Sequence, residues 1–441
     1  MVPIDHSAYV KTLTESYFLN ETFWFTVPGG RLMQTYQDVR RGDAYDNAMG
    51  VQFMIRQKST VDHGKEILNA FANQMYCDLG QKPDDGWRGK KNTASGEFVQ
   101  LFPRTFKPES AHQTKPKGSW QEDYAVGNNA YVGLAFAHAS TVLAENDENA
   151  ACYALAAYDI ADAIWETRKC PSHDFPKEAF DGANTESMAD WVGLLNTLNQ
   201  HGDYATQVAG TVKFYKDAYN NNNPSYFTSL SCSNYPSGSD FGNGAHPADT
   251  TFWSSMADAA LTGTKYSDNM INAMKNVLSM VNVENENSDV GHYQGNYYNG
   301  FKFSDKAEWI QWEVTASAGA MSMMHSLDKH EEQMRSVGLY DIFQSRNWAY
   351  LDSITYLIET TGSVPGSVHS SGSRHFKGES WCYNHIPHLA ASSWSGMAML
   401  MADWKDTDAF NVFAAQKGML SRADAQKQCT NIKQTLAKCI N

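Results

Sequence analysis

Acidic residues recur at the predicted starts of helices, where each is flanked by aromatic or amide side chains. The candidates are Asp46, Glu186, Asp249 and Glu313. Cleavage of a glycosidic bond needs two carboxyl groups: one protonates the leaving oxygen, and the other activates water or attacks the anomeric carbon. Acidic residues also favour helix N-termini because they cap free N–H groups and complement the helix dipole. Capping explains any one of them, but their recurrence at several helix starts favours a shared site.

The surroundings of each carboxyl group suggest its role. A helix N-terminus lowers the pKa of a carboxyl group, which suits a base, whereas apolar surroundings raise the pKa, which suits an acid. Glu313 follows two tryptophans and Glu186 precedes another, so either is a candidate acid. Asp249, close to a phenylalanine and a tryptophan, is the leading candidate base, with Asp46 in reserve. The predicted catalytic residues are therefore Glu313, Asp249 and Glu186.

Aromatic, amide and imidazole side chains near these carboxyl groups are typical of a sugar-binding cleft, where rings stack on sugars and polar groups bind hydroxyls. The loop GHYQGNYYNG at residues 291–300 is rich in such groups, although a packed hairpin would also explain it. The predicted substrate-binding residues are Tyr45, Asp46, Asn128, Trp253, His292, Tyr293, Tyr298, Trp312, Trp381, Tyr383 and His388.

Histidines cluster near the C-terminal third of the chain, at His369, His375, His385 and His388. No pair of them has the HExxH spacing, so a hydrogen-bonding role for His385 or His388 is favoured over a metal site. The sequence also lacks a GxGxxG fingerprint, a P-loop and a GxSxG elbow. No metal and no cofactor are predicted.

The elements that must position these groups are helices. Apolar residues at helical spacing predict helix pairs, in which the first helix is apolar and rich in small residues and the second is more charged. Long loops lead into the first helix of each pair, so they are expected on one face. DNAMG at 46–50 resembles NNAYVG at 128–133, which suggests a repeat. The predicted helices span residues 7–19, 44–57, 63–77, 128–145, 150–167, 187–199, 203–220, 250–261, 267–281, 311–339, 347–360 and 387–404.

This pattern predicts an all-α (α/α)6 toroid of six helical hairpins, an inner ring of helices wrapped by an outer ring, forming a single domain over residues 1–441. The residues 7–19 are expected to pack against 387–404. Strand content is expected to be low, with short hairpins in loops such as 295–303.

Several motifs resemble the six-hairpin glycosidase-like superfamily. They are Asp46-Asn47-Ala48, Gly127-Asn128-Asn129-Ala130, Thr185-Glu186, Asp249 with Trp253, Glu313 with Thr315-Ala316, Trp381-Cys382-Tyr383-Asn384, Pro387-His388-Leu389-Ala390 and Ser393-Trp394. The resemblance implies the (α/α)6 toroid and, most often, inverting glycoside hydrolysis. Its members also include polysaccharide lyases, sugar epimerases and a dehydratase-isomerase, so the fold alone does not fix the activity.

The favoured function is an inverting glycoside hydrolase acting on a neutral poly- or oligosaccharide. A polysaccharide lyase is the alternative, with Tyr293 or His292 as base and Arg374 or Lys302 as the positive group. A small-molecule isomerase or dehydratase, and a non-catalytic glycan-binding protein, also remain open.

Composition and charge narrow the partners. The net charge of −14 disfavours nucleic acid and anionic membranes, and no apolar stretch is long enough for a transmembrane helix. The expected partner is a carbohydrate, and the sequence does not indicate an oligomeric state. Of seven cysteines, Cys429 and Cys439 are close enough in sequence to pair, and the odd number leaves at least one thiol free. These cysteines and the sequon at Asn20 lean towards a secreted or extracellular protein; the first residues do not form a signal peptide, so a cytoplasmic location stays open.

Overall fold

Among the described residues, six helices are rich in alanine, glycine, serine and methionine, and most of their described side chains are buried. The second of them in the chain, α4 (Val126–Val142), is almost entirely buried because it carries apolar or small residues on every side. The computed structural model describes residues 5–77, 88–89, 93–108, 118–178, 180–262, 267–326, 331–379 and 382–439. The six inner helices are α2 (Ala44–Met54), α4, α6 (Thr185–Leu198), α8 (Ala248–Thr262), α10 (Trp312–Ser326) and α13 (Leu389–Trp404).

Each inner helix is preceded or followed in the chain by a more polar helix, as the sequence predicts. These outer helices are α1 (Ser7–Leu13), α3 (Val61–Tyr76), α5 (Ala150–Arg168), α7 (Ala205–Ala218), α9 (Asp268–Val281) and α12 (Tyr340–Thr361). The short helices α11 (Glu331–Ser336), α14 (Thr407–Phe410) and α15 (Arg422–Gln428) complete the set within the described residues. The predicted helix pairs are confirmed. α12 begins seven residues earlier than predicted, just after Gly338, whose φ of +74° separates it from α11.

The described chain divides into two compact units. Unit 1 comprises Met1–Asn20, Tyr215–Leu230 and Ser237–Asn411; unit 2 comprises Glu21–Phe214, Ser231–Pro236 and Val412–Asn441. The predicted single domain over residues 1–441 stays a prediction.

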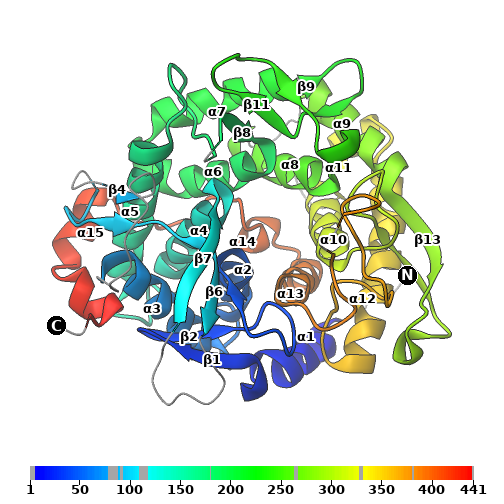
Figure 1. Ribbon diagram of the computed structural model, residues 1–441, viewed down its shortest axis with the longest axis horizontal. Coiled ribbons are helices and arrows are strands. Elements are labelled where there is room, and N and C mark those ends of the chain that lie inside the picture. The colour runs from blue at the N-terminus through cyan, green and yellow to red at the C-terminus, as the bar shows by residue number, and fades with distance from the viewer. Residues whose placement is uncertain are drawn as a thin grey trace. The chain divides into compact units, whose positions relative to one another are not determined.

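In unit 2 the inner helices α2, α4 and α6 pack side by side in chain order. Gly133 of α4 permits close packing, because a Cβ there would lie 2.7 Å from a methyl group of Leu194 in α6. A three-stranded antiparallel sheet leads into α2 and α4 (Figure 1). Its strands are β3 (Gly42–Asp43), β6 (Pro103–Pro108) and β7 (Gly118–Tyr124); the unit also contains β1 (Trp24–Val27) with β2 (Gly30–Met33), β4 (Arg88–Gly89) with β5 (Val99–Gln100), and β8 (Gly182–Asn184).

In unit 1 the inner helix α10 packs against both α8 and α13. The N-terminal helix α1 packs against α13, as predicted, and His6 fastens it: its backbone N–H and its ring Nδ1 both contact the Asp403 carboxylate, at 3.0 and 2.7 Å. Strand content is low, as expected. The antiparallel pairs are β13 (Asn282–Asn287) with β14 (Tyr297–Phe301), β9 (Tyr219–Asn220) with β10 (Ser225–Tyr226), and β11 (Ser229–Ser231) with β12 (Gly238–Ser239).

Three disulfides lie in unit 2: Cys77–Cys439, Cys152–Cys429 and Cys170–Cys232. The predicted pairing of Cys429 with Cys439 is wrong, because each of them binds a cysteine near the C-terminal end of an outer helix or within one, far away in sequence. Cys382 keeps a free thiol, in agreement with the odd number of cysteines. Among the helices of the described residues, none has both the length and the apolar character needed to span a bilayer.

Candidate active site

The starts of α8 and α10 in unit 1 are fastened to the same short segment of chain. The backbone N–H of Ala248, the first residue of α8, donates to the carbonyl oxygen of Phe303 over 2.7 Å. The N–H of Gln311, just before α10, donates to the carbonyl oxygen of Phe301 over 2.8 Å. Because Phe301 and Phe303 are two residues apart at the end of β14, the first turns of the two helices are held close together.

The start of α13 joins the same arrangement through the loop that follows α12. The N–H of Trp312, the first residue of α10, donates to the carbonyl oxygen of Gly366 over 3.1 Å. The N–H of His388, just before α13, donates to the carbonyl oxygen of Val364 over 2.9 Å. The three inner helices of unit 1 therefore begin at one end of that unit, as the sequence predicts for the loops that lead into them.

The fourth residue of several inner helices holds a loop residue by both of its backbone polar groups. In α10, Thr315 Oγ1 accepts the N–H of Phe301 over 2.9 Å and lies 3.4 Å from its carbonyl oxygen. In α13, Ser392 Oγ accepts the N–H of Val364 over 3.1 Å and donates to its carbonyl oxygen over 3.3 Å. Buried backbone groups must be paired, so these hydroxyls lock the loops onto the helices.

The same contact recurs in unit 2 with asparagine. Asn47 in α2 accepts the N–H of Met33 over 2.8 Å and donates to its carbonyl oxygen over 3.1 Å. Asn129 in α4 does the same with Phe102, at 2.7 and 3.1 Å. The similarity of DNAMG and NNAYVG thus reflects a shared role. The four clamp residues are Asn47, Asn129, Thr315 and Ser392.

Asp249 and Glu313 are each the second residue of their helices and are almost fully buried, at 4% and 6% exposed. The N–H of Thr250 donates to Asp249 Oδ1 over 2.7 Å, and Gln311 Nε2 donates to Glu313 Oε2 over 3.3 Å. Gln311 Oε1 also accepts the N–H of Val314, so Gln311 supplies the capping oxygen of α10. Capping therefore does not explain Glu313.

The tryptophans beside these carboxyl groups are packed. Trp253 is 3% exposed and stacks on Trp394, with ring centroids 5.9 Å apart. Trp312 is fully buried and meets Tyr298 edge to face at 5.8 Å. The predicted contact of these rings with substrate stays a prediction.

The aromatic loop of unit 1 is partly a packed hairpin, the second interpretation of its sequence. Tyr293 and Tyr298 are buried, and the Tyr298 hydroxyl donates to the carbonyl oxygen of Tyr293 over 3.1 Å. His292 is exposed, with its ring 4.1 Å from that of Tyr293. Tyr297 was not singled out from the sequence, yet it is the exposed tyrosine of this loop.

Tyr383 and His388 lie near the start of α13. Both are buried, and their ring centroids are 5.9 Å apart in an edge-to-face arrangement. Trp381, the remaining predicted residue of this segment, lies outside the described residues.

In unit 2 the start of α2 carries a pair of buried carboxyl groups. Burial and the charge of Asp46 raise the pKa of Asp43 to about 6, against the opposing effect of Arg41, which contacts it at 2.9 Å. Thr105 donates to the other oxygen of Asp43. Only Asp46 was predicted; Asp43 was missed, although it directly precedes the helix. The predicted Tyr45 packs edge to face on a tyrosine of α4, at 4.7 Å.

Glu186 occupies the second position of α6, matching Asp249 and Glu313 in their helices. Asn184 accepts the N–H of Ser187 over 3.1 Å and is the cap of α6, so capping does not explain Glu186 either. Its side chain is half-buried. Asn128, also half-buried, lies in the first turn of α4 next to the clamp residue Asn129.

Comparisons with known proteins agree with this architecture. The chain is similar to a variant of a reducing-end-xylose releasing exo-oligoxylanase complexed with xylobiose, at 11% identity and a TM-score of 0.54 over 93% of both chains. It is similar to the unsaturated glucuronyl hydrolase of Bacillus sp. GL1, described as responsible for the degradation of glycosaminoglycan, at 11% identity and a TM-score of 0.57 over 94% of this chain and 99% of that one. A third is Rex8A from Paenibacillus barcinonensis complexed with xylose, at 10% identity and a TM-score of 0.51 over 93% of both chains.

The fold of the chain is similar to that of these solved structures. The predicted (α/α)6 fold is thereby confirmed. The named neighbours are enzymes that act on carbohydrates. No protein-family model matches the chain, and no curated protein matches it.

Within this (α/α)6 fold, a carboxyl group that the sequence did not single out lies beside the start of α10. Burial raises the pKa of Glu286 in β13 to about 7, while both its oxygens accept the N–H of Ile310 at 3.2 Å. Its Oε1 lies 3.5 Å from Nε2 of His369, whose ring stacks on Trp309 at 3.9 Å. Glu286 belongs to the polar run NVENEN, in which nothing marks one residue over the next.

Proposed function

We propose that the chain is a glycoside hydrolase that cleaves a neutral poly- or oligosaccharide, with Glu313 and Asp249 as its catalytic carboxyl groups. The observation that carries the proposal is their equivalent placement: each is buried at the second position of an inner helix, and the two helix starts are fastened to Phe301 and Phe303. Two carboxyl groups at adjoining helix starts are the minimum that glycoside hydrolysis requires.

The roles follow from charge and surroundings. Glu313, which is almost fully buried and directly follows the buried Trp312, is the proposed acid: it gives its proton to the glycosidic oxygen as the bond to the anomeric carbon breaks. Asp249, which accepts a backbone N–H in the first turn of α8, is the proposed base and takes a proton from the attacking water. An inverting reaction needs the two carboxyl groups roughly 6.5–9.5 Å apart, with water between them. Glu186 is the further candidate acid.

A neutral substrate is supported by charge and by the neighbours. The net charge of −14 opposes binding of a polyanion. The exo-oligoxylanase provides a precedent for a neutral oligosaccharide, and the unsaturated glucuronyl hydrolase is a precedent for an acidic one. A xylooligosaccharide is therefore the first substrate to test.

A lyase is the second candidate, and one observation weakens it. Burial raises the pKa of Tyr293 far above that of an ordinary tyrosine, and a neutral phenol is a poor base. His292 is exposed and stays available for that role.

The test is product release from a panel of xylo-, cello-, manno- and glucuronate-containing oligosaccharides. New reducing ends without new ultraviolet absorbance support hydrolysis, and absorbance from a fresh double bond would make the chain a lyase. Binding without any product would make it a glycan-binding protein, and conversion of a small molecule alone would make it an isomerase or dehydratase.

The disulfides are informative about the cellular compartment in which the protein acts. Cysteine pairs of this kind persist in oxidising surroundings and are rare in the cytosol. The three disulfides of unit 2 therefore support the proposal that the protein acts outside the cytoplasm.

A further inference from the structure

One aromatic side chain of unit 2 is exposed on the loop that leads into α6. Phe180 is 61% exposed. Residues after it form β8 and pass directly into α6, while Glu178, two residues before it, accepts the N–H of Val126, the first residue of α4, over 2.9 Å. Phe180 therefore belongs to a loop held at the starts of α4 and α6, the end of these helices where Glu186 and Asn128 lie.

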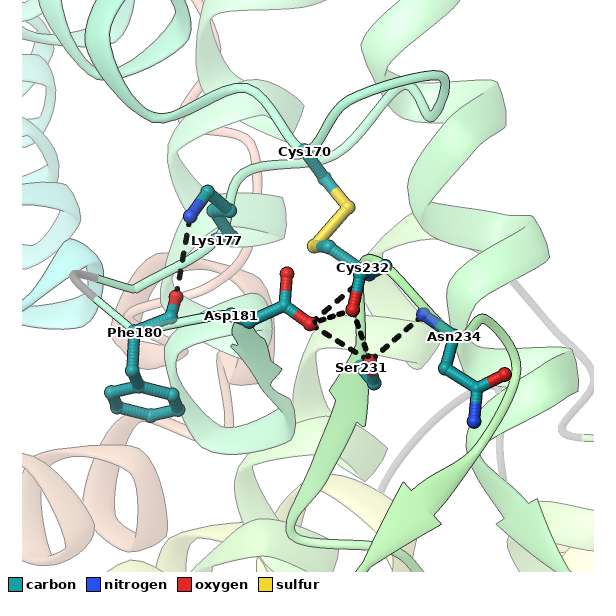
Figure 2. The surroundings of a disulfide bond; sticks show 8 residues. Cys170, Lys177, Phe180, Asp181, Ser231, Cys232 and Asn234 are labelled. Carbon is teal, nitrogen blue, oxygen red and sulfur yellow. Dashed lines mark hydrogen bonds between the residues drawn. A yellow bond between two sulfur atoms is a disulfide. The ribbon is translucent and has the colours of Figure 1, made fainter.

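This loop is fastened on the side of Phe180 that leads into β8. The carbonyl oxygen of Asp181 accepts the N–H of Cys232 over 2.9 Å, and its carboxylate accepts the Ser231 hydroxyl over 2.9 Å and the Ser233 N–H over 3.1 Å. The disulfide from Cys170 to Cys232 ties the same segment to the beginning of the loop. In Figure 2 the Phe180 ring points away from this hydrogen-bonded cluster.

The exposed position of the Phe180 ring is not explained by a contribution to the stability of the fold. Ordering a residue costs conformational entropy, and an exposed phenyl buries little apolar area in return. The same arrangement lowers the cost of binding, because a rigid aromatic surface needs no further ordering when a ligand covers it. A flat apolar ring fits the apolar face of a pyranose.

We propose that Phe180 is a carbohydrate-binding platform. One pyranose ring of a neutral oligosaccharide stacks on it, and the other sugar units of that oligosaccharide lie along the starts of α4 and α6. The class of ligand rests on the proposed glycoside hydrolase function. Asp181, whose carboxylate is engaged with Ser231 and Ser233, and the Cys170–Cys232 disulfide act as positioning groups.

Titration calorimetry tests the platform, with xylohexaose, cellohexaose and mannohexaose as probes and a Glu313→Gln background to prevent turnover. Adding Phe180→Ala is expected to raise the Kd of the best-bound hexasaccharide about tenfold, whereas Phe180→Tyr, which keeps the ring, changes it less than twofold. Trp404→Ala is the matched control: Trp404 is 72% exposed but ends α13, roughly 22 Å along the helix from its start. It should leave the Kd unchanged.

The positioning part is tested with Cys170→Ser/Cys232→Ser in the same background. The expected result is a weaker Kd for hexasaccharide that adding Phe180→Ala weakens little further, since both changes act through the same platform. A further loss as large as Phe180→Ala causes with the disulfide intact would mean that the disulfide serves folding alone.

The platform is overturned if Phe180→Ala binds the hexasaccharide as tightly as its background, or if the background binds none of the three probes. Hydrolysis is scored separately on wild-type protein and trisaccharide. Product release together with an unaffected Phe180→Ala titration rejects the platform and leaves the hydrolase; a weakened titration without product release by wild-type protein does the reverse.

Discussion

Asp249 and Glu313 occupy the same position, the second residue, of two neighbouring inner helices whose starts are fastened two residues apart on the chain at Phe301 and Phe303. These backbone hydrogen bonds hold the first turns of the two helices close together, and each first turn carries one of the carboxyl groups. An acid and a base of hydrolysis must be held in fixed geometry, and placing both on rigid helices fastened to one strand end achieves this.

The clamp residues are expected to carry stability. Asn129→Ala should lower the free energy of unfolding by about 2–4 kcal/mol, because it leaves the buried N–H and carbonyl of Phe102 without their partner. The neighbouring Asn128→Ala, at a half-buried position, should change it by less than about 0.5 kcal/mol. Urea unfolding of both variants checks this. Equal midpoints for the two would show that the clamp contributes nothing.

Glu286 is expected to make stability fall as pH rises. Its folded pKa of about 7 lies above the ordinary value of 4.5, so the folded protein keeps a proton that the unfolded chain has lost. The contribution of Glu286 to the free energy of unfolding is fully present below pH 4.5 and disappears as the pH rises to about 7. The change is about 3 kcal/mol at most. Glu286→Gln, which mimics the protonated form, should remove this slope. Urea unfolding of both proteins between pH 4.5 and 7.5 measures it.

The histidine beside Glu286 acts in the opposite direction. Burial lowers the pKa of His369, so the folded protein favours the neutral ring. The contribution of His369 to the free energy of unfolding is therefore present above about pH 6.5 and is lost as the pH falls. The comparison of wild-type protein with Glu286→Gln isolates the carboxyl group, since His369 is present in both. Parallel curves for the two proteins across the whole range would contradict the raised pKa.

The disulfides predict which cysteine-containing peptides are covalently linked. Peptide mapping without reduction should recover Cys152 linked to Cys429 and Cys77 linked to Cys439. Replacing Cys152 and Cys429 by serine should destabilise the protein by roughly 3–5 kcal/mol, because that bond closes a long loop of the unfolded chain. A peptide linking Cys429 to Cys439 would refute these pairings.

Helical periodicity and small-residue content were enough to predict the helix pairs. Helices such as α4 are apolar all round, which leaves burial as the only explanation. The similarity between the starts of α2 and α4 was visible in sequence, and the structure explains it by Asn47 and Asn129. In α10 and α13, Thr315 and Ser392 make the same contact, and no similarity between the sequences around them indicates it.

The surroundings of the site were harder to predict because they depend on contacts far apart in sequence. The sequence around Trp312 does not reveal that its ring packs edge to face against Tyr298 of the hairpin. Glu286 acquires its raised pKa from burial beside Ile310, 24 residues away. Disulfide pairing likewise depends on which helices pack together, so the short spacing of Cys429 and Cys439 was misleading.

The most direct test of the central claim compares initial rates of oligosaccharide hydrolysis for wild-type protein, Glu313→Gln, Asp249→Asn and the control Gln207→Glu, an amide-to-acid change on the outer helix α7. Loss of an acid or base costs about 10²–10⁴-fold, so both site variants should fall by that factor while keeping the wild-type melting temperature, and the control should retain full rate. Full activity in Glu313→Gln and Asp249→Asn would contradict the account.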